Sequence, residues 1–271
     1  MSIKVSTKSE LFYRILTTIV ALPLLFIIIA MGSLFLLGLS TFIAAFAYWE
    51  YSQIVNSTKK NFPLSLGILL TCLLPIISNW GHHSLLIALT IYLGIFFIIF
   101  FIFKIIKKNQ YFRFIELIGV IYIGIPISFA ILINNLNDGT TFLFLIIAIV
   151  FTSDSFSYFT GKLIGKHLLA PTISSGKTWE GLMGGLVGTL IAVYIFPKLL
   201  SLKLDLYESI LIALTIGLMA PIGDLVESKL KRSFNVKNSG ILIPGHGGIL
   251  DRLDSLGFGF IAGYFIILRV L

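Results

Sequence analysis

The chain has 271 residues, of which 57% are hydrophobic and 12% are charged, and its mean hydropathy is +1.01. Soluble domains carry about 25% charged residues, so this composition excludes an ordinary soluble globular protein, a disordered chain and a disulfide scaffold. It is typical of an all-α membrane protein that crosses the bilayer several times, for which the formal net charge of +8 requires no nucleic-acid partner.

Nine apolar segments are long enough to cross a hydrocarbon core about 30 Å thick, which needs roughly 20 residues per helix. We predict transmembrane helices over residues 11–31, 33–55, 63–80, 84–106, 115–135, 141–163, 179–200, 207–230 and 254–270. The first segment is too long for the apolar part of a secretory signal, and we expect it to be a retained span. Cys72, the single cysteine, lies inside the third segment and can form no internal disulfide.

Basic residues are distributed unequally between alternate loops. One side of the predicted membrane collects 17 of the 20 Lys and Arg residues, and the other side has Lys198, Lys203 and Arg269. Because cytoplasmic loops are enriched in basic residues, this asymmetry favours nine spans with a cytoplasmic N-terminus and an outer C-terminus. It also accounts for the net charge.

Acidic residues divide the chain into two regions of one integral membrane unit, a multi-span region at 1–140 and a catalytic region at 141–271. In the first region, and at the ends of later spans, we expect solvated carboxylates at Glu10, Glu50, Glu116, Asp138, Asp205 and Glu208. Six others lie at the cytoplasmic ends of the last four spans, namely Asp154, Glu180, Asp224, Glu227, Asp251 and Asp254. A carboxylate in a membrane is costly unless it meets a cation or water, so these six are functional candidates.

The eighth span carries a polar stripe. Asp224, Glu227 and Ser228 share one helix face, and Lys231 extends that face by one turn. A glycine-rich connection, 244–248, then leads to Asp251 and Asp254 at the start of the ninth span. Oxygen ligands without cysteine favour Mg²⁺ that shares its coordination shell with substrate phosphates.

A second polar cluster reads GKLIGKHLLAPTISSGKTWEG over residues 161–181. It is not a P-loop, because Pro171 stands where the first glycine is required and no strand precedes it. Lys177 and Thr178 still offer an ammonium and a hydroxyl to phosphate just before a helix N-terminus. The two overlapping G-x-x-x-G pairs formed by Gly181, Gly184, Gly185 and Gly188 predict close helix packing.

These residues resemble one known family, the phosphatidate cytidylyltransferases, also called CDP-diacylglycerol synthases. The resemblance is carried by Ser228-x-x-Lys231-Arg232, Lys237-x-x-Gly240 and Ile243-Pro244-Gly245-His246-Gly247-Gly248-x-x-Asp251-Arg252-x-Asp254. Upstream, Asp154-x-x-x-Tyr158-x-x-Gly161 and Ser174-x-x-Lys177-Thr178-x-Glu180-Gly181 are similar to the family's other polar segment. The sequence departs from the family pattern at Asn238, where the family has aspartate.

The resemblance implies transfer of the cytidylyl group of CTP to phosphatidic acid at the cytoplasmic face of a bacterial inner membrane. It implies Mg²⁺ at Asp224 and Asp251, and catalytic roles for Ser228, Lys231 and Asp254. The implied phosphate-binding residues are Lys177, Thr178, Arg232, Lys237, His246, Gly247, Gly248 and Arg252. A monovalent cation beside Mg²⁺ and a homodimer are both left open.

Two other functions remain alternatives. A CTP-dependent lipid kinase, such as a polyprenol kinase, would use similar phosphate and metal chemistry but would transfer the γ-phosphoryl group. A cation-coupled or proton-coupled transporter would use Asp154 and Asp224 as relays. The polar residues are confined to the last four spans with no matching pattern in the first five, which disfavours a carrier built from two related halves.

Overall fold

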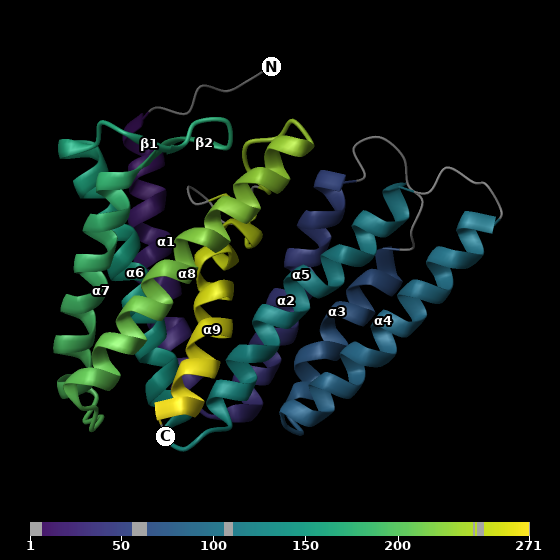
Figure 1. Ribbon diagram of the computed structural model, residues 1–271, viewed down its shortest axis with the longest axis horizontal. Helices are drawn as coiled ribbons and strands as arrows, with labels where there is room; N and C mark the ends of the chain where they lie inside the picture. Colours follow the sequence, from purple (N-terminus) through teal and green to yellow (C-terminus); the bar gives the residue numbers. More distant parts are fainter. Residues whose placement is uncertain (1–6, 56–63, 106–110, 241, 243–246, 271) are drawn as a thin grey trace.

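The computed structural model describes residues 7–55, 64–105, 111–240, 242 and 247–270 (Figure 1). Within these ranges the helices are joined by turns, short connections and one β-ribbon, which confirms the predicted all-α membrane class. The helices are α1 (Thr7–Ala30), α2 (Ser33–Val55), α3 (Leu64–Ser78), α4 (His82–Ile105), α5 (Tyr111–Asn134), α6 (Gly139–Ile164), α7 (Trp179–Leu199), α8 (Leu206–Ser233) and α9 (Leu250–Val270).

Six of the described helices, α2 and α5 to α9, have the length and apolar composition that a membrane span requires. Among the residues whose side chains the structure describes, α1, α3 and α4 offer shorter apolar stretches, at Ile19–Ala30, Leu64–Ser78 and His82–Ile98. The count of nine spans therefore stays a prediction. α9 begins at Leu250, earlier than the predicted residue 254, and this places both Asp251 and Asp254 on the helix.

A two-stranded antiparallel ribbon, β1 (Leu168–Ala170) and β2 (Ser174–Thr178), joins α6 to α7. The sequence analysis predicted no strand here. Thr178 ends the ribbon and caps α7, since its side chain accepts a hydrogen bond from Gly181 N at 3.0 Å. The ribbon thereby directs Lys177, one residue earlier, toward α8.

α6 and α7 pack closely through the predicted glycines. A Cβ atom added at Gly184 would collide with Thr160, and one added at Gly185 would collide with Ser157. This close approach confirms the packing role predicted for the G-x-x-x-G pairs. It fixes the ribbon and the start of α7 against the end of α6.

α9 joins two groups of helices, since it contacts α2 and α5 on one side and α6 and α8 on the other. α2, α3 and α5 contact one another, α8 packs along α9, and α9 also contacts α5 and α6. Figure 1 shows the start of α1, the ribbon and the end of α8 at one end of the molecule, with the end of α9 at the opposite end. The polar segments predicted to carry the chemistry therefore share one end of the helical body.

Candidate active site

The polar stripe of α8 forms one wall of the site. The Ser228 hydroxyl donates a hydrogen bond to Asp224 Oδ1 at 3.3 Å, and Lys231 Nζ lies 3.2 Å from Glu227 Oε1. Both pairs are one helical turn apart, as the spacing predicts. Glu227 is fully buried, so its charge depends on the partly buried Lys231 beside it.

Lys177 brings the ribbon onto this stripe. Its Nζ atom lies 2.6 Å from Asp224 Oδ2 and donates a second hydrogen bond to the carbonyl of Pro221 at 3.4 Å. The lysine and Asp224 are both partly buried, at 22% and 31% exposure. The two polar segments that the sequence singled out separately thus meet at a single ion pair.

Asp251, on the first turn of α9, is the centre of a second set of contacts. Its Oδ1 atom accepts a hydrogen bond from Lys231 Nζ at 2.6 Å, and its Oδ2 atom accepts from Gly248 N at 2.9 Å and Ser239 N at 3.1 Å. Charge-assisted bonds of this kind are among the strongest in proteins. Asp251 therefore ties the end of α8 and the segment after it to the start of α9.

Negative charge accumulates between these elements. Asp154 on α6 interacts electrostatically with Asp224 and Asp254, and Asp254 also interacts with Glu227. No three His, Cys, Asp or Glu side chains in the described part of the chain converge tightly enough to hold a metal ion unaided.

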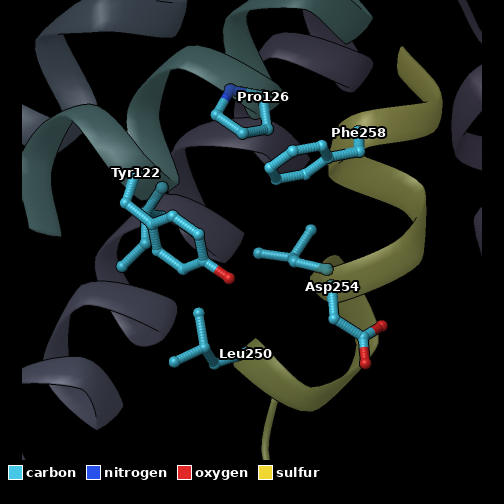
Figure 2. A pocket seen from close by; sticks show the side chains of 7 residues that line it. Tyr122, Pro126, Leu250, Asp254 and Phe258 are labelled. Carbon is cyan, nitrogen blue, oxygen red and sulfur yellow. The ribbon is translucent and has the colours of Figure 1, made fainter. Parts of the chain in front are cut away.

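Asp254 also borders a small cavity between α5 and α9, shown in Figure 2. Its Oδ1 atom accepts a hydrogen bond from Ser255 N at 2.6 Å. Tyr122 and Pro126 line the cavity from α5, and Phe258 lines it from α9. The phenol of Tyr122 points into the space between the helices and interacts electrostatically with Glu227, Asp254 and Asp224.

The other predicted phosphate-binding residues have varied positions. Arg252 is exposed and interacts electrostatically with Asp154, and Lys237 is exposed after the end of α8. Arg232 donates a hydrogen bond to the carbonyl of Val236 at 3.2 Å. Gly247 has a φ of +87°, a conformation that favours glycine. His246 lies outside the described residues.

The ribbon has its own anchor. Glu180, in the first turn of α7, accepts a hydrogen bond from the backbone N–H of His167 at 3.2 Å, and its Oε1 atom lies 2.6 Å from His167 Nδ1. Glu180 was one of the six acidic candidates. Its contacts hold the ribbon near α7 and thereby help to place Lys177.

The sequence analysis was wrong about two acidic residues of the first region. Glu50 and Glu116, expected to be solvated, are each 1% exposed. Glu50 reaches the site, because it accepts a hydrogen bond from Leu250 N at 2.9 Å. Glu50 lies three residues after Ala47 and four before Ile54, both buried, on one face of α2. No signal in the sequence marks this face, because α2 is apolar around most of its circumference.

Lysines and carboxylates thus gather at one end of a bundle of apolar helices. The sequence model of the Cytidylyltransferase family matches residues 12–270, so the chain belongs to this family. The match extends through both regions of the chain, including the first five helices, for which the motifs alone gave little information.

Curated relatives carry a more specific name. The chain is 33% identical to the phosphatidate cytidylyltransferase of Bacillus subtilis (strain 168) over 260 residues, which cover 94% of this chain and 96% of the relative. It is 33% identical to the phosphatidate cytidylyltransferases of Staphylococcus saprophyticus over 252 residues and Staphylococcus aureus (strain COL) over 254 residues. Each of these two alignments covers 90% of this chain and 94% of the relative.

Proposed function

We propose that the protein transfers the cytidylyl group of CTP to phosphatidic acid, which gives CDP-diacylglycerol and pyrophosphate. The observation that carries this proposal is the meeting of Lys177 with the Asp224 stripe, because it joins two polar segments of the family into one phosphate-handling site. The names and nearly full-length coverage of the relatives support the same reaction.

The reaction joins two polyanions. A phosphate oxygen of phosphatidic acid attacks the α-phosphorus of CTP, and the bond from that phosphorus to the β-phosphate oxygen breaks to release pyrophosphate. A deprotonated phosphate is already a nucleophile, so the protein has little need of a general base. Its main task is to offset the repulsion between the substrates and the charge of the leaving group.

The donor set fits Mg²⁺. Among the described residues of the site, five carboxylates interact with three cationic side chains: Asp154, Asp224, Glu227, Asp251 and Asp254 with Lys177, Lys231 and Arg252. Mg²⁺ commonly uses one or two carboxylates plus substrate phosphates, which suits a cluster without a closed protein cage. When bound, it would neutralise phosphate charge and polarise the reacting phosphorus.

We assign Asp224 to the cation, with Asp251 as the second predicted ligand and Asp254 beside them. Ser228 keeps Asp224 oriented through its hydrogen bond. Asp251 already accepts hydrogen bonds from three donors, so much of its contribution is to hold Lys231 and the Gly248 backbone in place. A monovalent cation near the same carboxylates is a further proposal, consistent with their excess charge.

The basic residues are assigned to the phosphates. Lys177 is held at the site by Asp224 and can exchange that partner for a CTP oxygen, and Lys231 stands between Glu227 and Asp251. The exposed side chains of Arg232, Lys237 and Arg252 complete a basic rim. Thr178 acts mainly as the α7 cap, which directs the α7 N-terminus toward the site.

A product assay tests the reaction and separates it from its alternatives. Purified protein is incubated with phosphatidic acid and CTP labelled in either the α- or the γ-phosphate, with and without Mg²⁺. We expect α-label in CDP-diacylglycerol and γ-label in pyrophosphate. Transfer of γ-label to phosphatidic acid, or to a polyprenol supplied in its place, would indicate a kinase, and absence of transfer to either lipid would leave the transporter as the alternative. Light scattering of the same preparation tests whether the protein is a homodimer, which the sequence leaves open.

The orientation is proposed from the loop charges: a bacterial inner membrane, a cytoplasmic N-terminus and a site at the cytoplasmic face. In a Cys72→Ala background, we expect a cysteine at Ser175 to be protected from an impermeant thiol reagent in right-side-out vesicles. A cysteine at Asp138, at the opposite end of α6, should react. Labelling at Ser175 but not at Asp138 would reverse the orientation.

A further inference from the structure

Glu50 is a buried acid of the first region that the proposed chemistry does not use. It lies near the end of α2 and is 1% exposed. A carboxylate at such a site requires hydrogen-bond donors to offset the cost of leaving water. Its donors come from residues about 200 positions later in the chain, around the start of α9.

The contacts of Glu50 converge on the turn that precedes α9. Its Oε2 atom accepts a hydrogen bond from Leu250 N at 2.9 Å and a longer one from the Ser239 hydroxyl at 3.4 Å. Leu250 is the first residue of α9, and the first N–H groups of a helix have no partner inside the helix. Glu50 thus caps α9 from another helix.

The glycines of this turn make room for the Glu50 carboxylate. A Cβ atom at Gly240 would collide with Glu50 Oε1, and one at Gly248 would collide with Oε2. Both glycines belong to the motif near the site. Their lack of a side chain permits the close approach of α2, which gives these two positions a physical reason to be glycine.

The network continues from Glu50 to the catalytic cluster. Ser239, which donates to Glu50, accepts a hydrogen bond from Asp251 N at 3.3 Å, and its own N–H donates to Asp251 Oδ2. Asp251 in turn holds Lys231. A change at Glu50 therefore reaches the carboxylate and the lysine of the site through one intermediate residue.

We infer that Glu50 is a positioning residue for the reaction: it fixes the Ser239 segment and the start of α9, and through them Asp251 and Lys231. The inference rests on the proposed function, since it concerns the geometry of the same site. Its physical basis is geometric. α2 holds the buried carboxylate at the distance at which it accepts hydrogen bonds from Leu250 N and the Ser239 hydroxyl. Without it, these donors would lose a partner.

Three substitutions separate length, oxygen acceptor and charge. Glu50→Gln keeps the length and one acceptor oxygen, Glu50→Asp shortens the side chain, and Glu50→Ala removes the acceptor. Glu116→Gln is the matched control, because Glu116 is equally buried but lies on α5 near Tyr48 and Tyr51. It replaces a buried carboxylate by an amide away from the turn.

The first readout is hydrogen exchange of the backbone amides of Ser239 and Leu250, which does not depend on activity. We expect these amides to exchange about tenfold faster in Glu50→Ala and Glu50→Asp, and within about threefold of the parent in Glu50→Gln and Glu116→Gln. Exchange at the parent rate in Glu50→Ala would overturn the inference, whatever the enzyme does.

The second readout is steady-state turnover with CTP, phosphatidic acid and Mg²⁺. We expect kcat to fall about tenfold and the Mg²⁺ concentration for half-maximal rate to rise about fivefold in Glu50→Ala, with most activity retained in Glu50→Gln. Faster exchange with unchanged kcat and Mg²⁺ dependence would also overturn the role. Lack of cytidylyl transfer by the parent protein would instead refute the proposed function.

Ser239→Ala keeps the test decisive if Glu50→Ala does not insert. It removes the hydroxyl that links Glu50 to Asp251 and leaves the Leu250 contact in place. We expect a smaller change in the same direction, about threefold in kcat, with faster exchange at Asp251 N. Parent-like values for both quantities would contradict the network.

Discussion

The two regions of the chain contribute to the site in different ways. β2, α8 and α9 supply the lysines, the hydroxyl and most of the carboxylates near Asp224, and these side chains form direct contacts. α6 adds Asp154, which interacts electrostatically with Asp224 and Asp254. α2 supplies Glu50, which accepts a hydrogen bond from Leu250 at the start of α9. α5 supplies Tyr122, which lines the cavity beside Asp254. One region thus carries the charges, and the other fixes where those charges lie.

Residues far from the motifs in the sequence can therefore still determine the geometry of the site. A cluster of charge in a membrane needs rigid surroundings, because each displaced carboxylate loses a partner that water does not replace. In this protein the rigidity comes from tight helix contacts, such as the tyrosine rings of α2 beside Gly67 of α3 and Gly119 of α5. We therefore expect the apolar region to help fix the geometry of the site.

The largest expected effect is at Asp224. Asp224→Ala removes the proposed cation ligand and the partners of Lys177 and Ser228, and we expect turnover to fall by about 1,000-fold or more. Asp205→Ala is the matched control on the same helix, since Asp205 caps the opposite end of α8. It should cost about 1 kcal/mol of stability and little activity.

Both variants are measured as kcat after membrane insertion has been verified. Activity near the parent level in Asp224→Ala would remove this residue from the cation site. It would also contradict the division between a charge-bearing region (141–271), which carries the catalytic charges, and a positioning region (1–140), which fixes where they lie.

A smaller effect is expected at Lys177. Lys177→Met keeps the apolar stem and removes the ammonium, so the loss reports on phosphate charge rather than packing. We expect kcat/KM for CTP to fall about 100-fold, which corresponds to about 2.7 kcal/mol. The control is Lys166→Met, because Lys166 is exposed just before the ribbon.

The KM for CTP distinguishes two roles of Lys177. A lysine that contacts phosphate should weaken CTP binding or its transition state. If Lys177→Met changed only thermal stability, the lysine would be a structural partner of Asp224 and would not contact the phosphates of CTP.

Much of the charge-bearing region could be predicted from the sequence, and much of the positioning region could not. The stripe of Asp224, Glu227, Ser228 and Lys231 follows from helical periodicity, which is local. The burial of Glu50 depends on contacts with residues far along the chain. From the local sequence alone, a carboxylate near the end of a span is predicted to be solvated. The ribbon was missed because β1 has only three residues and Gly176 interrupts the alternation in β2 that a strand prediction needs.

Tyr122 tests whether α5 also acts on the site. Tyr122→Phe removes the phenol that points into the cavity beside Asp254 and keeps the ring that packs there. We expect kcat to fall about fivefold, with thermal stability nearly unchanged. Ile123→Val, which trims another residue lining the cavity, is the control for packing. Equal activity of Tyr122→Phe and the parent would confine the role of α5 to packing.

The smallest effect is expected at Asn238, where the sequence departs from the family pattern. Asn238 is exposed, one residue after Lys237 and one before Ser239, whose N–H donates to Asp251. If the family's aspartate were a cation ligand, Asn238→Asp would lower the Mg²⁺ concentration needed for half-maximal rate.

We expect that concentration to stay within about twofold, because asparagine and aspartate serve almost equally well in turns and caps. The site already holds a surplus of carboxylates and must also accept a triphosphate, so another negative charge offers little gain. A Mg²⁺ titration of both proteins decides between the two roles. A shift of about tenfold, or 1.4 kcal/mol, would make Asn238 a weakened ligand position. The turn before α9 would then contribute to cation binding directly.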